Sequence, residues 1–545
     1  MPRHVSPAAT VALVALVATL VLGWGIGGYV LYEPDEARHA EVAREMVSAS
    51  TWREWVVPRL DGTPYLNKPA PFYWLMAAAI ATLGVNERAA RSISLAAALV
   101  TVLVVSLWGA RRWGYRVGAL AGLVLVTAPE FVLLGRFATL DMTLTLWTTL
   151  GMLAVYHFAE RPEGSTGASL VPAAIAGALG LLTKGLLAPG FIALTGVVWL
   201  VARGRLRLLT PRALAAAAAT FLVLVLPWHL AAGALDPAYL RKLYIDQQWK
   251  RAVEAGGRLH GRPLLFYVPI LLGGFLPWSA LLPATLWGTL RRPVRGAAES
   301  FCALWAGVVL VVLSLAQGKV ASYIVLAFPP LALLTSRHLG RLLWDGIAPL
   351  EERLVRGGAW LVVAVLAIAP VVVLALGSSR YGGALARTSL WSLIFLVPAA
   401  AIAMLLLRAS LRSVVIAMGA GSAALLVLFF RLAAPSLSEV HSDAALGRAI
   451  RAVPEHAAAP VVAYGLSSPS TSFYAERPLL LYDRPRQIRA LLAEHGLIFV
   501  VTSPLHSAEL VAIGPFVPWY VGSRHVLYAS QPPPAPLESA KGDAG

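Results

Sequence analysis

The apolar stretch AATVALVALVATLVLGWGIGGYVL, residues 8–31, is followed directly by the polar segment YEPDEARHAEVAREMVSASTWREWVVPRLDGTPYLNKPAPFYW, residues 32–74. The apolar stretch contains no charged residue and is longer than the roughly 20 apolar residues that a helix needs to cross a bilayer. We therefore predict that the polar segment lies on the far side of a membrane. It begins a first outer loop, residues 32–87, where we expect the chemistry to take place.

The overall composition indicates a polytopic membrane protein. The chain has 545 residues, of which 58% are hydrophobic and 13% charged, and its mean hydropathy is +0.70. These values do not fit a single soluble core. The net charge of +17 does not indicate a nucleic-acid partner, because most Arg and Lys residues form short clusters between apolar runs. The single cysteine, Cys302, excludes an internal disulfide and a thiolate metal cluster.

Window hydropathy predicts about thirteen membrane-spanning helices. The predicted spans cover residues 9–31, 88–109, 117–134, 139–158, 169–183, 186–202, 213–233, 264–289, 300–317, 321–337, 359–377, 389–407 and 413–433. The predicted fold is thus an all-α membrane domain over residues 1–433. An odd number of spans with a cytoplasmic N-terminus places the C-terminus outside.

The distribution of arginines tests this topology independently of hydropathy. All the large arginine clusters between predicted spans fall on one side, which should be cytoplasmic because positive charge is retained there. These clusters are Arg111, Arg112 and Arg116; Arg161; Arg203, Arg205, Arg207 and Arg212; Arg291, Arg292 and Arg295; Arg337, Arg341, Arg353 and Arg356; and Arg408 and Arg412.

The last hundred residues resemble a small soluble domain. Apolar runs at residues 460–464, 479–482, 497–502 and 526–528 alternate with helical patterns such as residues 486–494. This alternation predicts a periplasmic α/β domain over residues 434–530. Residues 531–545, QPPPAPLESAKGDAG, are rich in proline and polar residues, which is typical of a disordered tail.

Two acidic residues, Asp35 and Glu36, begin an amphipathic helical pattern in the first outer loop. The segment from residue 37 to residue 48 has apolar residues at helical spacing and could lie on the membrane surface. Asp35 could simply cap this helix, and Glu36 could favour its dipole. A carboxylate fixed at a helix start near the hydrocarbon boundary is also suited to act as a base or to hold a cation. We regard both residues as candidate catalytic groups.

The second acidic candidate is Asp141, at the outer mouth of a predicted span in the sequence GRFATLDM. Thr139 could cap this helix, and Asp141 could then be an ordinary acidic residue near its start. Its neighbour Arg136 favours a functional role, because opposite charges near membrane depth usually line a wet cavity.

Several Lys and Arg residues lie on the predicted outer side of the membrane. The retention of positive charge in the cytoplasm does not account for them. Lys68 precedes Pro69, so its backbone should be extended and stiff. Lys184 and Lys319 interrupt apolar regions near helix ends. Each lysine could simply extend to the membrane interface. Together with Arg136, Lys250 and Arg251, they fit an anion site better, and phosphate is the expected anion beside a membrane.

The motifs YEPDEARHAEVAREM, WVVPRLDGTPYLNKPAPFYW, GRFATLDM, LLTKG and KVASYIVLAFPPLALL occur in an order that resembles the bacterial branch of the GT-C glycosyltransferases. This branch is related to protein O-mannosyltransferases, and the likeness is greatest to the lipid A aminoarabinose transferases. It covers about residues 32–334. The resemblance implies a multi-helix membrane fold with juxtamembrane helices, an undecaprenyl-phosphate-linked sugar donor and inversion at the anomeric carbon.

The resemblance also implies roles for individual residues. Asp35 and Asp141 match the principal acidic residues, Lys68 matches a motif lysine, and Lys184 and Tyr323 match positions near the donor phosphate. The chain departs from the family at Asn67, where a glutamate is common, and at Gln247 and Gln248. These departures leave a metal site in doubt, although His260 stands where the family tends to have a histidine. We expect no certain cofactor and leave a divalent metal open.

We therefore expect an inverting glycosyltransferase in the bacterial inner membrane, with its active site facing the periplasm. It would move a sugar from a polyprenyl phosphate to lipid A or another envelope glycan. The expected phosphate-binding residues are Lys68, Lys184, Arg136, Tyr323, Lys319 and Arg251, and the expected partners are the lipid-linked sugar, the acceptor and membrane lipids. A protein O-glycosyltransferase remains an alternative. So does a saccharide flippase, although a transporter is expected to show repeat symmetry.

Overall fold

The computed structural model describes residues 7–161, 169–253, 262–291, 296–453, 456 and 458–532. The chain divides into two compact units. The first, which we call the helical unit, consists of Met1–Trp24, Asn67–Phe72 and Ser94–Ala433. The second, the mixed unit, consists of Gly25–Leu66, Tyr73–Ile93 and Ala434–Gly545. This division differs from the expected domain boundaries, because most of the first outer loop groups with the C-terminal residues.

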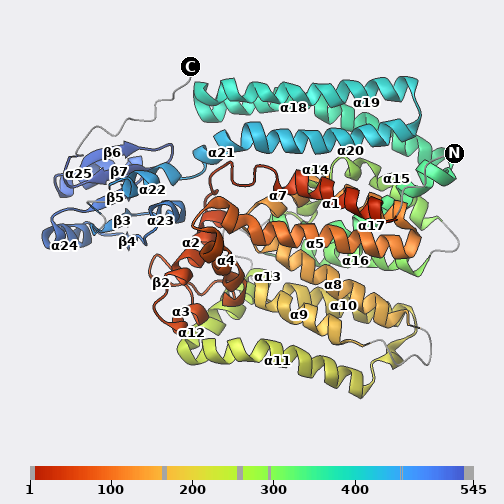
Figure 1. The fold of residues 1–545 in the computed structure, drawn as a ribbon, viewed down its shortest axis with the longest axis horizontal. Coiled ribbons are helices and arrows are strands. Elements are labelled where there is room, and N and C mark those ends of the chain that lie inside the picture. Colours follow the sequence, from red (N-terminus) through yellow and green to blue (C-terminus); the bar gives the residue numbers. More distant parts are fainter. Residues whose placement is uncertain are drawn as a thin grey trace. The chain divides into compact units, whose positions relative to one another are not determined.

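The helical unit is built from α-helices joined by short 3-10 and π-helical turns (Figure 1). Its helices are α1 (Pro7–Gly23), most of α5 (Glu87–Trp113), α6 (Tyr115–Val126), α7 (Pro129–Arg136), α8 (Asp141–Ala159), α9 (Val171–Lys184), α10 (Leu187–Ala202), α11 (Pro211–Leu235), α12 (Pro237–Leu240), α13 (Lys250–Val253), α14 (Tyr267–Gly274), α15 (Leu282–Leu290), α16 (Ala297–Leu315), α17 (Phe328–Gly340), α18 (Pro349–Thr388), α19 (Leu396–Arg408) and α20 (Leu411–Leu428). The turns that matter for the site are η2 (Arg241–Trp249) and η5 (Ala321–Ala327).

Six described helices are long and apolar enough to cross a membrane, or up to eight spans if each of two bent pairs counts as one. The six are Glu87–Trp113, Pro211–Leu235, Ala297–Leu315, Pro349–Ala375, Leu390–Arg408 and Leu411–Val440. Every predicted span overlaps a helix, so the expectation of a polytopic helical membrane fold is confirmed. The count of about thirteen spans stays a prediction, because four other apolar helices are only 10–17 residues long.

The bent pairs explain why two predicted spans are not single straight helices. Tyr115–Val126 and Pro129–Arg136 meet at 68°, and Leu264–Gly274 and Trp278–Thr289 meet at 109°. A proline stands at each break, Pro129 in the first pair and Pro277 in the second. Proline disfavours helical backbone in the residue before it and cannot donate a backbone hydrogen bond, so a helix tends to break there.

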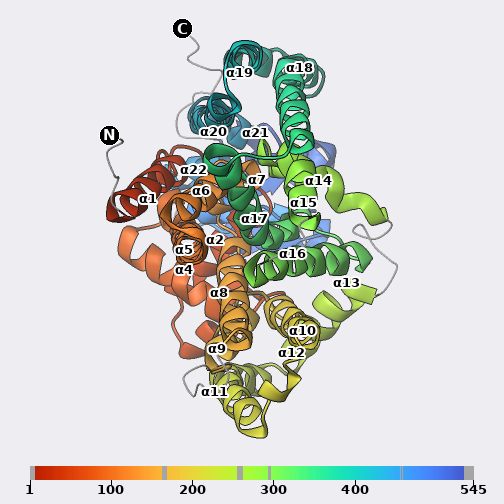
Figure 2. The ribbon, with the colours of Figure 1, turned by 90° about the vertical axis from the view of Figure 1, so that its right-hand side faces the viewer.

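Helix α8 is the centre of the helical unit. It is buried on nearly all sides and packs against α9 and α10, while α11 packs on α9 (Figure 2). Gly151 permits this close packing, because a Cβ atom at that position would lie 2.2 Å from Ile192 Cδ1. Small residues allow such approaches between membrane helices. The N-terminus of α8 therefore has a fixed position in the unit, and Asp141 is its first residue.

The mixed unit contains α2 (Asp35–Val47), α3 (Trp52–Val56), the hairpin of β1 (Arg59–Leu60) and β2 (Thr63–Pro64), and most of α4 (Ala70–Leu83). Its C-terminal part adds a five-stranded sheet and covering helices. The strands are β3 (Val461–Tyr464), β4 (Leu480–Tyr482), β5 (Phe499–Thr502), β6 (Val517–Val521) and β7 (Val526–Ala529), and the helices are α21 (Ala434–Val440), α22 (Ala444–Arg451), α23 (Pro469–Ala475), α24 (Pro485–His495) and α25 (Ser507–Ile513).

The sheet confirms the prediction of a small C-terminal α/β domain. Its strand order is β4-β3-β5-β7-β6, with β3 parallel to β4 and β5, and β7 antiparallel to β5 and β6. Side chains such as Phe499 and Val500 alternate between apolar clusters on its two faces. Of the five strands, β6 was not predicted. It is an edge strand with an irregular register between Pro518 and Tyr520, and proline weakens a strand signal. Residues 533–545, most of the predicted tail, lie outside the described residues.

Helix α2 differs from the predicted surface helix. It begins at Asp35, close to the predicted start, but much of its length is buried within the mixed unit, including Ala40, Ala43 and Arg44. It is therefore packed against protein and does not have the open polar face of a helix that lies on a membrane.

Candidate functional site

Asp141 lies at the start of α8, where its side chain is buried. Its Oδ1 accepts hydrogen bonds from Lys184 Nζ at 2.7 Å and from Ser322 Oγ at 3.0 Å. A carboxylate is also favoured at this end of a helix by the dipole. The N-cap position belongs to Leu140 and has no side-chain cap, so Thr139 does not cap the helix.

Lys184 is the last residue of α9, where Gly185, with a φ of +91°, ends the helix. The helix dipole favours a cation at this end. The lysine is buried, and its Nζ lies 4.6 Å from the centroid of the Tyr323 ring. Asp141, Lys184, Ser322 and Tyr323 thus come together from α8, α9 and η5. Ser322 was not among the predicted site residues, although it lies in the motif KVASYIVLAFPPLALL directly before Tyr323.

A cavity of about 370 Å³ opens beside this group. Lys68, Lys184 and Tyr323 contribute to its lining, together with Gln247, Gln248 and Trp249 of η2. The remaining lining is mainly apolar and comes from α10 and the end of α16. Tyr239 donates a hydrogen bond of 2.5 Å to the backbone carbonyl of Lys68, which ties the lysine segment to α12. Such a site suits a ligand with an anionic head and a hydrocarbon body.

The other predicted phosphate-binding residues are placed differently. Arg136 is buried and donates to the carbonyls of Val21, Leu22 and Trp24 at 2.8–3.0 Å, at the end of α1. Lys319 donates to the carbonyl of Ala316 at 2.7 Å. Both cations thus satisfy carbonyls at helix ends, which otherwise lack partners. The side chain of Arg251, and all of His260, lie outside the described residues.

Asp35 and Glu36 belong to the mixed unit and differ in exposure. The Asp35 side chain is 71% exposed and lies 3.2 Å from Arg38 Nη2. It is the first residue of α2, after the N-cap residue Pro34. Glu36 is buried and makes two hydrogen bonds with Arg91, at 2.8 and 2.9 Å. Arg91 also donates to three backbone carbonyls, so the contacts of Glu36 are structural.

The segment that carries Asp35 is held by the C-terminal part of the mixed unit. The Glu33 N–H donates to the carbonyl of His441 at 2.9 Å, and the Glu33 carboxylate accepts from the Ser470 N–H at 2.5 Å. Tyr32 adds a hydrogen bond from its hydroxyl to the carbonyl of Ala434 at 3.4 Å. Burial raises the pKa of Glu33. The C-terminal domain therefore positions the start of α2 through the two residues directly before Pro34.

One group of described acidic residues has spacing that could suit a metal ion. Glu41, Glu45 and Asp61 offer carboxylate oxygens within 4.8 Å of one another. Burial raises the pKa of all three, that of Glu41 well above its usual range. Arg44 already makes two hydrogen bonds with Glu41, at 2.7 and 2.6 Å, and so supplies a compensating charge. Neither Asn67 nor any histidine belongs to this group.

Comparisons with known proteins agree with the architecture. Residues 29–239 match the family described as dolichyl-phosphate-mannose-protein mannosyltransferase. The chain is 32% identical over 322 residues to an undecaprenyl phosphate-alpha-4-amino-4-deoxy-L-arabinose arabinosyl transferase of Edwardsiella ictaluri, a match that covers 58% of this chain and 56% of the relative. A transferase of the same name from Aeromonas salmonicida is 32% identical over 361 residues, covering 64% of this chain and 63% of the relative. The chain thus spans less than two thirds of the length of these relatives.

The crystal structure of ArnT from Cupriavidus metallidurans bound to undecaprenyl phosphate has the same fold, with a TM-score of 0.77 and 24% identity over 96% of this chain and 98% of that one. At this level of identity the likeness shows the fold, which this chain shares with that transferase structure. The matches to the mannosyltransferase family model and to the arabinosyl transferases agree with the resemblance that the motifs predicted.

Proposed function

We propose that the chain is an inverting glycosyltransferase of the bacterial inner membrane. It takes a sugar from an undecaprenyl-phosphate-linked donor and transfers it to lipid A at the periplasmic face. The observation that carries the proposal is the cavity beside Asp141, in which Lys68 and Lys184 stand at the polar part of an otherwise apolar lining. The names of the matched relatives supply the sugar, 4-amino-4-deoxy-L-arabinose.

The donor phosphate is the leaving group in this reaction. An acceptor oxygen forms a bond to the anomeric carbon from the face opposite the phosphate, while the bond from that carbon to the phosphate oxygen breaks. Undecaprenyl phosphate leaves with one more negative charge than it carried in the donor. Lys68 and Lys184 stabilise this charge in a site of low dielectric, where such stabilisation is most effective. Asp141 holds Lys184 in place through their 2.7 Å contact.

Asp35 is assigned to the acceptor. With a hydroxyl acceptor, its carboxylate takes the proton that the oxygen loses on attack. With a phosphate acceptor there is no proton to remove, because the attacking oxygen is already ionised. Asp35 then orients the acceptor or stabilises positive charge on the sugar. The exposure of its side chain is compatible with both roles.

The test is transfer by the purified protein from undecaprenyl phosphate-linked aminoarabinose to lipid A, followed by mass spectrometry of the acceptor. Lys68→Ala should lower donor use roughly tenfold to hundredfold, because a charge-assisted phosphate contact contributes about 1.5–3 kcal/mol. Lys68→Arg should restore activity only in part, because its guanidinium is larger and planar. Lys242, an exposed lysine of η2, provides the control, and Lys242→Ala should be nearly neutral.

Equal and small losses for Lys68→Ala and Lys242→Ala would contradict the phosphate role of Lys68. Transfer to a periplasmic peptide or polysaccharide, with none to lipid A, would contradict the acceptor. Uptake or flipping of the donor without any glycosidic product would contradict the enzyme class itself.

A further inference from the structure

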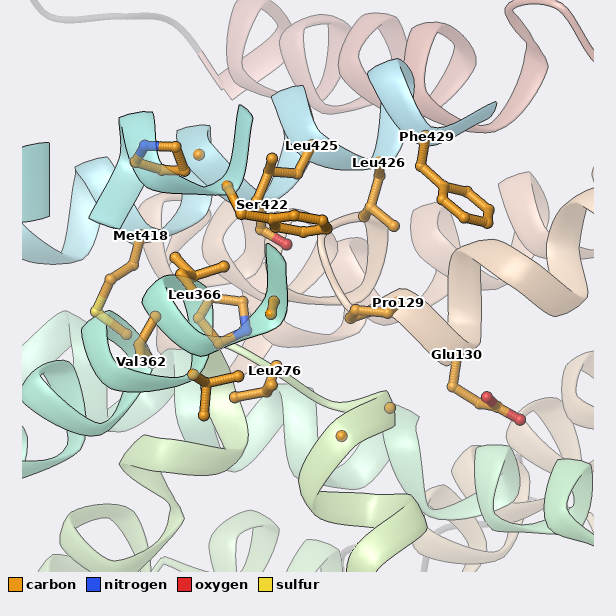
Figure 3. Close-up of a pocket in the computed structure, with 18 of the residues that line it drawn as sticks. Pro129, Glu130, Leu276, Val362, Leu366, Met418, Ser422, Leu425, Leu426 and Phe429 are labelled. Atoms are coloured by element: carbon orange, nitrogen blue, oxygen red, sulfur yellow. The ribbon is translucent and has the colours of Figure 1, made fainter. Parts of the chain in front are cut away.

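A second apolar cavity, of about 450 Å³, lies among α7, α14, α18, α19 and α20 of the helical unit (Figure 3). Leu366 of α18 and Met418, Leu425 and Leu426 of α20 are typical of its lining. Ser422 also lines it, but its hydroxyl donates to the carbonyl of Thr127 at 2.7 Å. The cavity therefore presents almost entirely hydrocarbon surface, and its volume is in the range of small-molecule sites.

One end of this cavity carries a carboxylate. Among the lining residues that the structure describes, Glu130 is the only charged one, and Figure 3 shows it at the opposite side of the cavity from Met418 and Val362. Gly274 leaves room for it, because a Cβ atom there would lie 2.7 Å from Glu130 Cβ. Glu130 belongs to α7, which packs against α8 and η5, the elements that carry Asp141 and Ser322. The helix that carries the polar end of the cavity is therefore a neighbour of the elements that carry Asp141 and Ser322.

We propose that this cavity binds an acyl chain of the lipid acceptor. Glu130 accepts a hydrogen bond from a hydroxyl group of the acceptor's sugar. The proposal rests on the proposed function and deepens it, because it makes the acceptor an acylated saccharide and not a protein. A transferase with two lipid substrates needs two hydrocarbon sites near one reaction centre. The helical unit offers two, one beside Lys184 and one beside Glu130.

Charge decides which lipid occupies which cavity. The cavity with Lys68 and Lys184 attracts the donor phosphate, whereas no Lys or Arg is among the described residues that line the cavity with Glu130. A carboxylate is a strong acceptor of hydrogen bonds from sugar hydroxyl groups. The donor lipid is therefore favoured in the first cavity, and the hydrocarbon chain of the acylated saccharide is favoured in the second.

A matched pair of substitutions in α18 tests the site. Ala369 lines the cavity, whereas Ala367, two residues earlier, is exposed on the outside of the same helix. Ala369→Trp should raise the KM for hexa-acylated lipid A about tenfold or more, because the indole ring fills space in which methylene groups of the acyl chain would be buried. Ala367→Trp should leave this KM unchanged. Both variants should bind undecaprenyl phosphate as the wild type does. An unchanged KM in Ala369→Trp would overturn the proposal.

Photo-crosslinking of the wild-type protein tests the site even if Ala369→Trp fails to fold. Lipid A with a diazirine in one acyl chain should label Leu366, Leu425 or Leu426, and unlabelled lipid A should compete. A phosphatidylethanolamine with the same diazirine should label these residues at least tenfold less at equal concentration. Equal labelling by both lipids would show a groove for bulk membrane lipid and would overturn the proposal.

These outcomes are separable from failure of the proposed function. If the wild-type protein transfers no sugar to lipid A, the proposed function fails. If it transfers sugar normally, but either the KM of Ala369→Trp is unchanged or both lipids label equally, only the acyl-chain site fails. Lipid A stripped of its acyl chains adds a further check, because Ala369→Trp and the wild type should use it equally well. A selective defect with this deacylated acceptor would also contradict the proposal.

Discussion

Asp141 and Lys184 form a buried ion pair, and each side chain is only 8% exposed. Removal of one partner leaves the other charge buried and uncompensated, which costs about 3–5 kcal/mol. We therefore expect Asp141→Asn and Lys184→Met each to lower the thermal unfolding temperature of the protein in detergent. The double substitution should recover most of this stability, because neither charge then remains. It should not recover transfer, because the donor phosphate has lost one of its two cations and only Lys68 remains.

This double-substitution cycle separates a structural pair from a functional one. Thermal unfolding and transfer rate are measured for the wild type, both single variants and the double variant. A stable double variant with wild-type turnover would show that the pair serves only the fold. Ser322→Ala is a useful comparison, because it removes the 3.0 Å contact to Asp141 without removing a charge.

Asp35 offers the opposite case, a carboxylate whose loss should affect activity and not stability. Its side chain is 71% exposed, and its ion pair with Arg38 is of the kind that contributes only about 0–1 kcal/mol. Asp35→Asn should therefore nearly abolish transfer and change the unfolding temperature very little. Asp483, an exposed residue of the C-terminal domain, provides a matched control, and Asp483→Asn should alter neither quantity. Wild-type turnover by Asp35→Asn would mean that this residue is not part of the reaction.

At the scale of elements, α2 depends on partners far away in the chain. The contacts of Glu33 with His441 and Ser470 connect residues more than 400 positions apart. They give the C-terminal domain a role that its sequence does not reveal, which is to hold the backbone on which Asp35 stands. The bidentate pair of Glu36 and Arg91 fixes the same segment from α5.

The raised pKa of Glu33 makes this arrangement dependent on pH. Burial is the largest cause, with the charge of Asp443 adding to it, and the hydrogen bonds from Ser470 and the charge of Arg524 oppose it. The folded state then holds the proton more tightly than the unfolded state, so the stabilising contribution is present at low pH. It is lost as pH rises through the raised pKa. The glutamine in Glu33→Gln cannot ionise. The stability of this variant should therefore equal that of the wild type near pH 5 and increasingly exceed it as the pH rises toward 8. Thermal unfolding across this range measures the difference, and a difference that shrinks with rising pH would contradict the assignment.

The same elements show what can and cannot be predicted from sequence. Hydropathy locates α5, α16 and α20 within a few residues, because membrane burial needs long apolar runs. It does not give the rotation of a helix about its axis. The sequence therefore predicted that Arg136 lies beside Asp141, five residues later in the chain. In the structure, the Arg136 side chain instead donates hydrogen bonds to carbonyl groups at the end of α1. Lys184 does contact Asp141, but 43 residues separate them, and only the packing of α8 on α9 brings them together.

At the scale of the whole molecule, the positive charge of the chain indicates its membrane topology. Most of the net charge of +17 comes from arginines in short segments between apolar helices. Positive charge in such segments resists transfer across the membrane, and it therefore marks the cytoplasmic side. The proposed function depends on this assignment, because lipid A at the periplasmic face is accessible only to a site that opens outside.

Cysteine labelling tests this topology, and the chain is suited to the experiment. Its single cysteine, Cys302, is buried in α16. Cys302→Ala therefore provides a cysteine-free protein into which single cysteines can be introduced. Thr63 and Arg207 are both exposed in the structure, so a cysteine at either position is open to reagent on its own side of the membrane. In intact spheroplasts a membrane-impermeant maleimide should modify Thr63→Cys and should modify Arg207→Cys only after lysis. The reverse pattern would place Asp35 in the cytoplasm, where a periplasm-facing transferase could not use it.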